Sequence, residues 1–130
     1  MWIVVHSTRG GQENLHLEYQ ATLNWFKNTA SQVSSHTVIG TFEGQHARVV
    51  PDQFSAWHAG EHNPYSLGVE LVQPTKDHPY SDWQYAELAR LIAYWKGLYP
   101  IEQVLGHDQT PQGIRVGKSD PGSQFDWERI

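Results

Sequence analysis

The chain has 130 residues, and nine Lys and Arg against fourteen Asp and Glu give it a formal net charge of −5 at pH 7. This is the length of one ordinary domain, and 38% hydrophobic residues suffice for a core without disulfides. The acidic balance excludes a basic surface for nucleic acid, the lack of cysteine excludes thiolate ligands and nucleophiles, and no apolar run approaches the roughly eighteen residues of a membrane helix.

The first half of the chain predicts one strand, one helix and one hairpin. Residues 2–6 are a β-branched apolar run ending in a polar residue, which predicts a buried strand that delivers His6 to a surface. Apolar side chains at helical spacing predict an amphipathic helix over residues 18–28. Residues 36–40 and 46–50 flank a glycine-containing turn and are predicted to pair as a hairpin.

The second half predicts a long helix between short strands. Ser81 with Gln84 is the capping-box pattern of a helix start, an apolar stripe continues to Leu98, and Pro100 ends the helix. The other predicted elements are strands at 56–57, 66–72 and 104–105, a loop rich in Gly, Pro and Asp up to residue 122, and a short helix at 126–128. Strands alternating with two long helices predict a single-domain α/β fold, a central mixed β-sheet packed against helices.

Metal ligands are sought among the eight histidines and the carboxylates, because thiolates are absent. His6 and His107 each follow a predicted buried strand, and Asp120 lies in the loop beyond His107. Two imidazoles and one carboxylate give Zn²⁺ three protein ligands and leave a fourth position for water, as a catalytic site requires. The alternative is that all three are bystanders, since their spacing differs from the compact helical His pair of other zinc hydrolases.

Glu70 is the single carboxylate in the apolar run of residues 66–72. Burying a carboxylate is costly unless it is paired or hydrogen-bonded, so two interpretations stay open. Glu70 either faces solvent opposite its apolar neighbours, or it is a general base whose pKa is raised by its apolar setting. Lys118 is likewise either a solvated loop lysine or a cation directed at the metal.

Six short motifs follow one another along nearly the whole chain. They are Ile3-Val4-Val5-His6-Ser7, Ser34-Ser35-His36-Thr37-Val38-Ile39, Ala56-Trp57-His58-Ala59-Gly60, Asn63 with Ser66-Leu67-Gly68-Val69-Glu70-Leu71, Gly106-His107-Asp108, and Lys118-Ser119-Asp120-Pro121-Gly122 with Phe125-Asp126-Trp127. In this order they resemble the type 2 N-acetylmuramoyl-L-alanine amidase family, which includes phage endolysins, recycling amidases and peptidoglycan recognition proteins. The resemblance implies that family's fold, with residues 1–130 as its catalytic domain.

The resemblance also implies a role for each matching residue. His6, His107 and Asp120 match the zinc ligands. Glu70 matches the catalytic glutamate of the recycling amidases, and Lys118 the catalytic lysine that steadies the developing oxyanion. The residues that match positions near the substrate are His36, Trp57, His58 and Asn63.

Two departures from the family pattern are consistent with this assignment. Some members use a cysteine as third ligand, and Asp120 at that position excludes a thiolate-ligated site. Some members have tyrosine where this chain has Ser35, and members with serine there tend to carry the glutamate seen here as Glu70.

The expected reaction is zinc-dependent hydrolysis of the amide between N-acetylmuramic acid and L-alanine, by a monomer acting on peptidoglycan or a muropeptide. The first alternative is a non-catalytic peptidoglycan-binding module, although such recognition proteins typically lack a zinc ligand. A second is a regulatory partner, since one phage amidase relative binds an RNA polymerase. A third is a structural zinc site, with Asp108 or Asp126 as fourth ligand.

The start of the chain lacks the cationic region and the long apolar run of a signal peptide. We therefore expect cytoplasmic synthesis without membrane insertion or nucleic-acid binding. The protein would then act on the cell wall as a phage endolysin, or on cytoplasmic muropeptides as a recycling enzyme.

Overall fold

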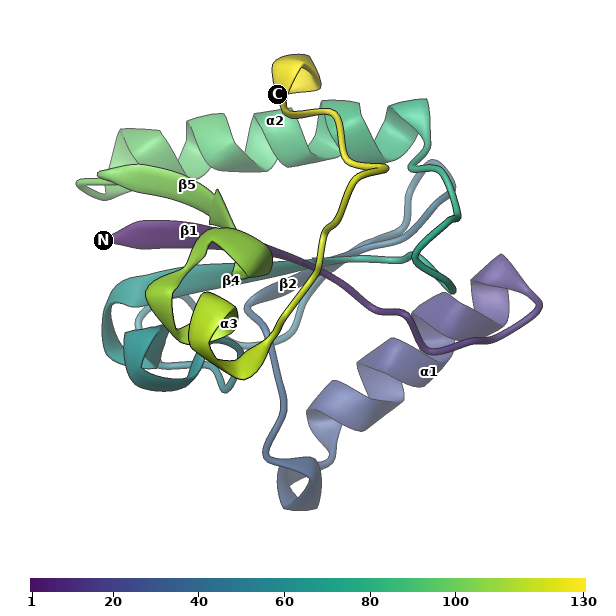
Figure 1. The fold of residues 1–130 in the computed structure, drawn as a ribbon, viewed down its shortest axis with the longest axis horizontal. Helices are drawn as coiled ribbons and strands as arrows, with labels where there is room; N and C mark the ends of the chain where they lie inside the picture. Colours follow the sequence, from purple (N-terminus) through teal and green to yellow (C-terminus); the bar gives the residue numbers. More distant parts are fainter.

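In the computed structural model, which describes all 130 residues, one mixed sheet lies between helices (Figure 1). The strands are β1 (Trp2–Ser7), β2 (Thr37–Ile39), β3 (His46–Arg48), β4 (Ser66–Leu71) and β5 (Gln103–Gly106), in the spatial order β3-β2-β4-β1-β5. The helices are α1 (Leu15–Lys27), α2 (Asp82–Leu98) and α3 (Pro111–Val116), with 3-10 turns η1 (Thr29–Ser31), η2 (Gly60–Tyr65), η3 (His107–Gln109) and η4 (Trp127–Arg129). The predicted α/β class is confirmed, and no helix has the length and apolar character needed to span a bilayer.

The central strands run parallel and therefore share one carboxyl edge. β1 lies between β4 and β5 and is parallel to both, and β2 is parallel to β4. Only β3 is antiparallel, paired with β2 as the predicted hairpin. Ligand sites in parallel sheets lie at the carboxyl ends of the strands, where the following loops converge.

Helix α2 covers one face of the sheet and forms the main core with it (Figure 1). Its start is the predicted capping box, in which Gln84 N–H donates to Ser81 Oγ and Ser81 N–H donates to Gln84 Oε1. The core side chains from the sheet are Ile3, Val5, Ile39, Leu67, Val69 and Leu71, and those from α2 are Tyr85, Leu88, Leu91, Ile92 and Trp95. Alternate residues of β1 and β4 therefore point away from α2, toward the opposite face.

The opposite face is covered in part by α1, which packs through Leu23 onto Val38 of β2 and onto Val72. Helix α1 begins at Leu15, earlier than predicted, because the side chain of Asn14 accepts hydrogen bonds from the first free N–H groups of the helix. The rest of this face carries the loops that follow the strands.

The predicted strand at residues 56–57 is wrong, because the Trp57 N–H donates to a side chain and the Trp57 carbonyl accepts from Ser34 N–H, which lies outside any strand. Trp57 N–H donates to Ser34 Oγ at 3.0 Å. The next two N–H groups, of His58 and Ala59, both donate to Asn63 Oδ1, at 3.1 and 2.7 Å. These bonds fold the segment into a tight turn ahead of η2.

The loop expected between His107 and residue 122 contains helix α3, which the sequence analysis missed. Its end signals are present in the sequence: the Thr110 side chain caps Gly113 N–H, Pro111 occupies the first turn, and Gly117 ends the helix at a φ of 78°. Helix α3 is only six residues long, too short for a recognisable apolar period. The short helix expected at 126–128 is observed as η4.

We expect Leu88→Ala to lower the free energy of unfolding by about 2–5 kcal/mol, because it empties a site inside the main core. Leu88 is fully buried, whereas Leu98 on the same helix is 54% exposed. Leu98→Ala is therefore the matched control, expected within about 0.5 kcal/mol of the wild type. Urea denaturation measures both, and equal effects would contradict this description of the core.

Candidate active site

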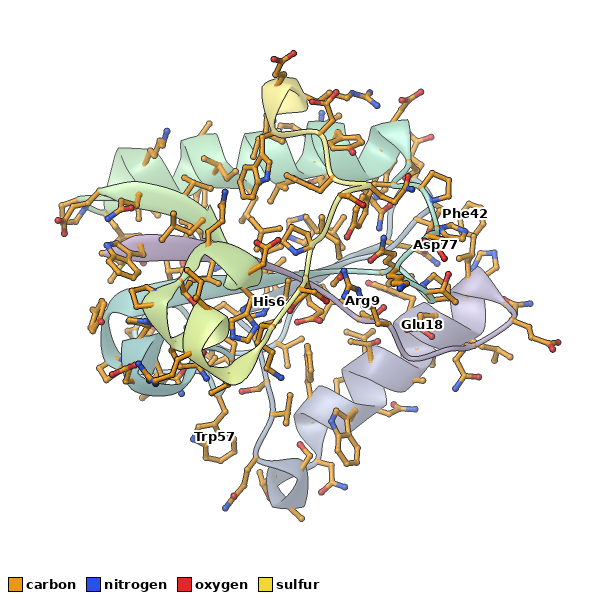
Figure 2. The ribbon with its side chains drawn as sticks, in the orientation of Figure 1. His6, Arg9, Glu18, Phe42, Trp57 and Asp77 are labelled. Carbon is orange, nitrogen blue, oxygen red and sulfur yellow. The ribbon has the colours of Figure 1, made fainter.

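The sheet topology brings together three polar side chains from separate strands. His6 of β1 pairs in register with Glu70 of β4, and Val5 of β1 pairs with Gly106, so His107 directly follows on the other side. The rings of His6 and His107 lie 4.5 Å apart between centroids. Figure 2 shows His6 in the middle of the molecule, on the side of the sheet away from α2.

Asp120 reaches these residues because the segment around it is attached to β1 and η3. Asp108 N–H donates to the Asp120 carbonyl at 2.9 Å, and Ser7 N–H lies 3.4 Å from Asp120 Oδ2. The Arg9 guanidinium donates to the hydroxyl and the carbonyl of Ser119, at 2.5 and 3.1 Å. These contacts hold the Asp120 carboxylate against the two histidines.

The three predicted ligands fit a zinc ion. His6 Nδ1 lies 3.2 Å from Asp120 Oδ2 and His107 Nδ1 lies 3.4 Å from Asp120 Oδ1, and the three ligand atoms fall within 4.8 Å of one another. Four ligands at the 2.0–2.1 Å typical of zinc–nitrogen and zinc–oxygen bonds stand about 3.3 Å apart at the corners of a tetrahedron. The two separations between Asp120 and the histidines, which involve different carboxylate oxygens, are close to this value.

The charges of the triad also suit a cation. Burial lowers the pKa of His6 despite the opposing effect of Asp120, which favours the neutral imidazole that metals require. Burial would raise the pKa of Asp120, but its close contacts with His107 and His6 outweigh burial and hold this pKa well below its ordinary value. The site thus offers an ionised carboxylate beside two imidazole rings.

A fourth protein ligand does not join the triad. The group of close ligand atoms comprises His6, His107 and Asp120. The side chain of Asp126 instead caps η4 by accepting from Glu128 N–H at 3.0 Å. Three protein ligands are the number expected of a catalytic rather than a structural zinc site.

Glu70 points to the same face as His6, opposite the side chains that pack against α2. It is half-buried and lines the site cavity. Burial, reinforced by the negative charge of Asp120, raises the pKa of Glu70 well above its ordinary value, while Lys118 opposes this shift. The solvent-facing interpretation is therefore not supported, and Glu70 has the environment of a general base.

A cavity of about 570 Å³ opens over the triad. Trp57, His58, Asn63 and Lys118 all line it, together with the triad and Glu70. Trp57 is 49% exposed and projects outward from the ribbon (Figure 2), whereas Nδ1 of His58 lies 3.0 Å from Nε2 of His6. Asn63 uses its side-chain oxygen to accept from His58 and Ala59 N–H groups.

His36, predicted to lie near the substrate cleft, does not line the cavity, although its ring centroid lies 5.9 Å from that of His58, which does. Its side chain is completely buried; Nδ1 accepts from Gly68 N–H at 3.0 Å and Nε2 donates to the Phe54 carbonyl at 2.8 Å. Both ring nitrogens are thus used to join β4 to the segment after β3. These two hydrogen bonds give the buried His36 ring a structural role.

Gln112 is a site residue that the sequence analysis did not identify. Its Oε1 lies 3.0 Å from Nε2 of His107, and its side chain lines the cavity. Helix α3 creates this contact. The only sequence signal that could have indicated it is the set of cap residues that predicts the helix.

Comparisons with known proteins agree with this site. Residues 1–123 match the family described as N-acetylmuramoyl-L-alanine amidase. The chain is 34% identical to N-acetylmuramoyl-L-alanine amidase A of Achromobacter lyticus, covering 96% of this chain and 77% of that protein. It is 36% identical to the 1,6-anhydro-N-acetylmuramyl-L-alanine amidase AmpD of Enterobacter cloacae, over 68% of this chain and half of that protein.

A solved relative carries the same fold. The N-acetylmuramyl-L-alanine amidase AmiD from E. coli, in complex with anhydro-N-acetylmuramic acid-L-Ala-D-γ-Glu-L-Lys, superposes with a TM-score of 0.81 at 25% identity. The match covers 98% of this chain and 55% of AmiD, so this chain corresponds to about half of that protein. The family match, the identities and the shared fold establish that the chain belongs to the type 2 N-acetylmuramoyl-L-alanine amidase family and is an enzyme of that family.

Proposed function

We propose that residues 1–130 form a zinc-dependent amidase domain that hydrolyses the bond between N-acetylmuramic acid and L-alanine in peptidoglycan or muropeptides. The observation that carries this proposal is the convergence of His6, His107 and Asp120, at zinc-ligand separations, in a cavity that also contains Glu70 and Lys118. His6, His107 and Asp120 would hold the zinc, which when bound lowers the pKa of a water molecule to about 7 and polarises a carbonyl oxygen.

Glu70 is the proposed general base. Its carboxylate shares a face and a register position with His6, which puts it beside the position where water would be activated. A base with a raised pKa holds an abstracted proton better, because its affinity for protons lies closer to that of the reacting groups. Glu70 takes the proton from the attacking water and returns it to the departing amine of L-alanine.

Lys118 is the proposed electrostatic stabiliser of the reaction. Its side chain lines the cavity two residues before Asp120, and its positive charge lowers the pKa of nearby Glu70. As the water adds, negative charge builds up on the scissile carbonyl oxygen. An ammonium group held near that oxygen stabilises the charge more than it stabilises the neutral substrate, which is what accelerates the step.

Trp57 is the proposed substrate-contact residue. Its half-exposed ring at the rim offers an apolar surface on which a sugar or a peptide side chain can lie. Asn63 supports this rim by bonding the turn that carries Trp57 and His58. The cavity volume of about 570 Å³ is within the usual range for small-molecule sites, which suits a muropeptide-sized ligand.

A peptidoglycan-binding module without activity is the alternative function on this fold. Three ligands with an open fourth position, a half-buried carboxylate with a raised pKa and a nearby cation favour catalysis, since binding alone requires none of them.

Product analysis with and without metal tests the proposal. The purified protein is incubated with intact peptidoglycan and, separately, with a soluble anhydro-muropeptide, each before and after treatment with chelator, and products are identified by mass spectrometry. We expect free stem peptides and intact sugars, loss of cleavage after chelation, and recovery with Zn²⁺ but not Mg²⁺. Comparison of the substrates separates wall lysis from muropeptide recycling.

A zinc-loaded, folded protein that leaves both substrates uncut would favour the binding-module alternative. Cleavage that persists in metal-free protein would instead refute zinc dependence.

A further inference from the structure

The two metal-ligand histidines present the same ring nitrogen to Asp120. Nδ1 of His6 lies 3.2 Å from one carboxylate oxygen, and Nδ1 of His107 lies 3.4 Å from the other. In each ring, Nε2 points away from Asp120 and meets a protein side chain: His58 in the first case and Gln112 in the second. A neutral imidazole carries one hydrogen, so these partners decide which nitrogen keeps its lone pair.

The partner of His6 is oriented by a chain of hydrogen bonds that ends at a carbonyl. Ser66 Oγ lies 2.7 Å from the His62 carbonyl oxygen, which can only accept, so the single hydroxyl hydrogen points there. Ser66 Oγ must then accept from Nε2–H of His58, 3.0 Å away. Nδ1 of His58 is thus left to accept from Nε2–H of His6, at 3.0 Å. The lone pair of His6 Nδ1 therefore faces Asp120.

The partner of His107 acts in the same sense. Gln112 Oε1 is an acceptor 3.0 Å from His107 Nε2, which leaves the lone pair on Nδ1 toward Asp120. Gln112 sits in α3, and its backbone N–H lies 3.4 Å from the ring of His62, in the same turn as the carbonyl that orients Ser66. The η2 turn thus supports both proposed zinc ligands, His6 and His107.

The His58 ring fits against strand β4 because the residue facing it is a glycine, Gly68. A Cβ atom on Gly68 would lie 2.6 Å from Nδ1 of His58, which is too close for any residue but glycine. His58 N–H is also held by Asn63 Oδ1 at 3.1 Å. The ring is therefore fixed from the backbone side and from the sheet side.

We propose that His58 and Gln112 are positioning residues that hold His6 and His107 in the tautomer with a free Nδ1, and so set the affinity of the site for zinc. This inference rests on the proposed zinc site, and it gives His58 a role other than contact with substrate. Comparable supporting hydrogen bonds change metal affinity by about 10–100-fold.

The test is to measure zinc dissociation constants by competition with a chelator of known affinity. The variants distinguish loss of the hydrogen-bond acceptor from a change in side-chain size. His58→Leu and Gln112→Met remove the acceptors and are expected to weaken zinc binding by about 10–100-fold. His58→Asn and Gln112→Glu retain an acceptor oxygen near the original atom, and each is expected to bind more tightly than its counterpart. His16→Gln, at an exposed position of α1, is the control and should match the wild type.

Nitrogen-15 NMR of the zinc-loaded wild type provides a second readout, with Nε2–H signals expected for both His6 and His107. A hydrogen on Nδ1 of either ring would overturn the assignment, as would a His58→Asn protein that binds zinc as weakly as His58→Leu. Wild-type protein that binds no zinc would remove the zinc site and this inference together. If the wild type binds zinc and the variants bind it with unchanged affinity, this inference alone would be refuted.

Discussion

Asp120→Ala is expected to yield a folded protein that holds substoichiometric zinc and hydrolyses no substrate. Asp120 is the one anionic group of the triad, and its two carboxylate oxygens face His6 and His107 separately. Without it, two neutral imidazoles remain, and the charge that compensates a dication is lost. Removing a supporting residue costs about 10–100-fold in metal affinity, so removing a direct ligand should cost more.

Metal content after dialysis, measured by elemental mass spectrometry, and stem-peptide release check this result. Asp82→Asn is the matched control, because Asp82 is a largely exposed aspartate whose surface pair with Arg129 contributes little. Circular dichroism must show that Asp120→Ala is folded, since Asp120 also contacts the backbone of Ser7. Stoichiometric zinc together with full activity in Asp120→Ala would show that the ligand assignment is wrong.

Lys118→Ala is expected to lower kcat by roughly 10²–10³ while zinc stays bound, as when one oxyanion donor is removed from a comparable hydrolase. Lys118 lines the cavity but is not one of the three ligands. Its backbone N–H donates to the Gly113 carbonyl at 2.8 Å, and alanine keeps that bond, so the local main chain is retained. The lost interaction is therefore that of the ammonium group with the developing charge.

Steady-state kinetics on the soluble muropeptide, with metal content measured on the same samples, separate the roles of Lys118. Loss of a contact made only in the transition state lowers kcat and kcat/KM together, whereas loss of ground-state binding raises KM alone. Lys96→Ala, on the exposed side of α2, is the control and should not change either. An unchanged kcat with a raised KM would reassign Lys118 to substrate binding.

The strands and the long helix were predictable because their signals are local. β1 and β4 are apolar runs with β-branched residues, as expected of strands buried on both faces. Helix α2 is indicated by its capping box and its apolar stripe. The turn at residues 56–57 and helix α3 were not predicted. In the turn, the side chains of Ser34 and Asn63 accept the backbone N–H hydrogen bonds that a neighbouring strand would otherwise accept. Helix α3 is too short to show the repeat of apolar residues that indicates a helix.

The candidate ligands could be named from residue types and motif order, but their neighbours could not. His36 and His58 each lie in one of the six family motifs, yet His36 is fully buried and His58 contacts His6. Gln112 carries no sequence signal of its contact with His107, which exists only because α3 folds back over η3.

The sequence by itself determined the kinds of groups available for chemistry, namely imidazoles and carboxylates with no thiolate, and the strands that carry His6 and Glu70. Only the tertiary structure decided that Asp120 meets His6 across 114 residues of chain, and that Glu70 faces the cavity rather than solvent. The reason is physical: hydrophobic periodicity is a local property, whereas register between parallel strands and the return of a loop to a distant strand depend on the whole packed sheet. The orientation of each imidazole ring is still harder to predict from the sequence, because it depends on which hydrogen-bond partners the packed fold places beside the two ring nitrogens.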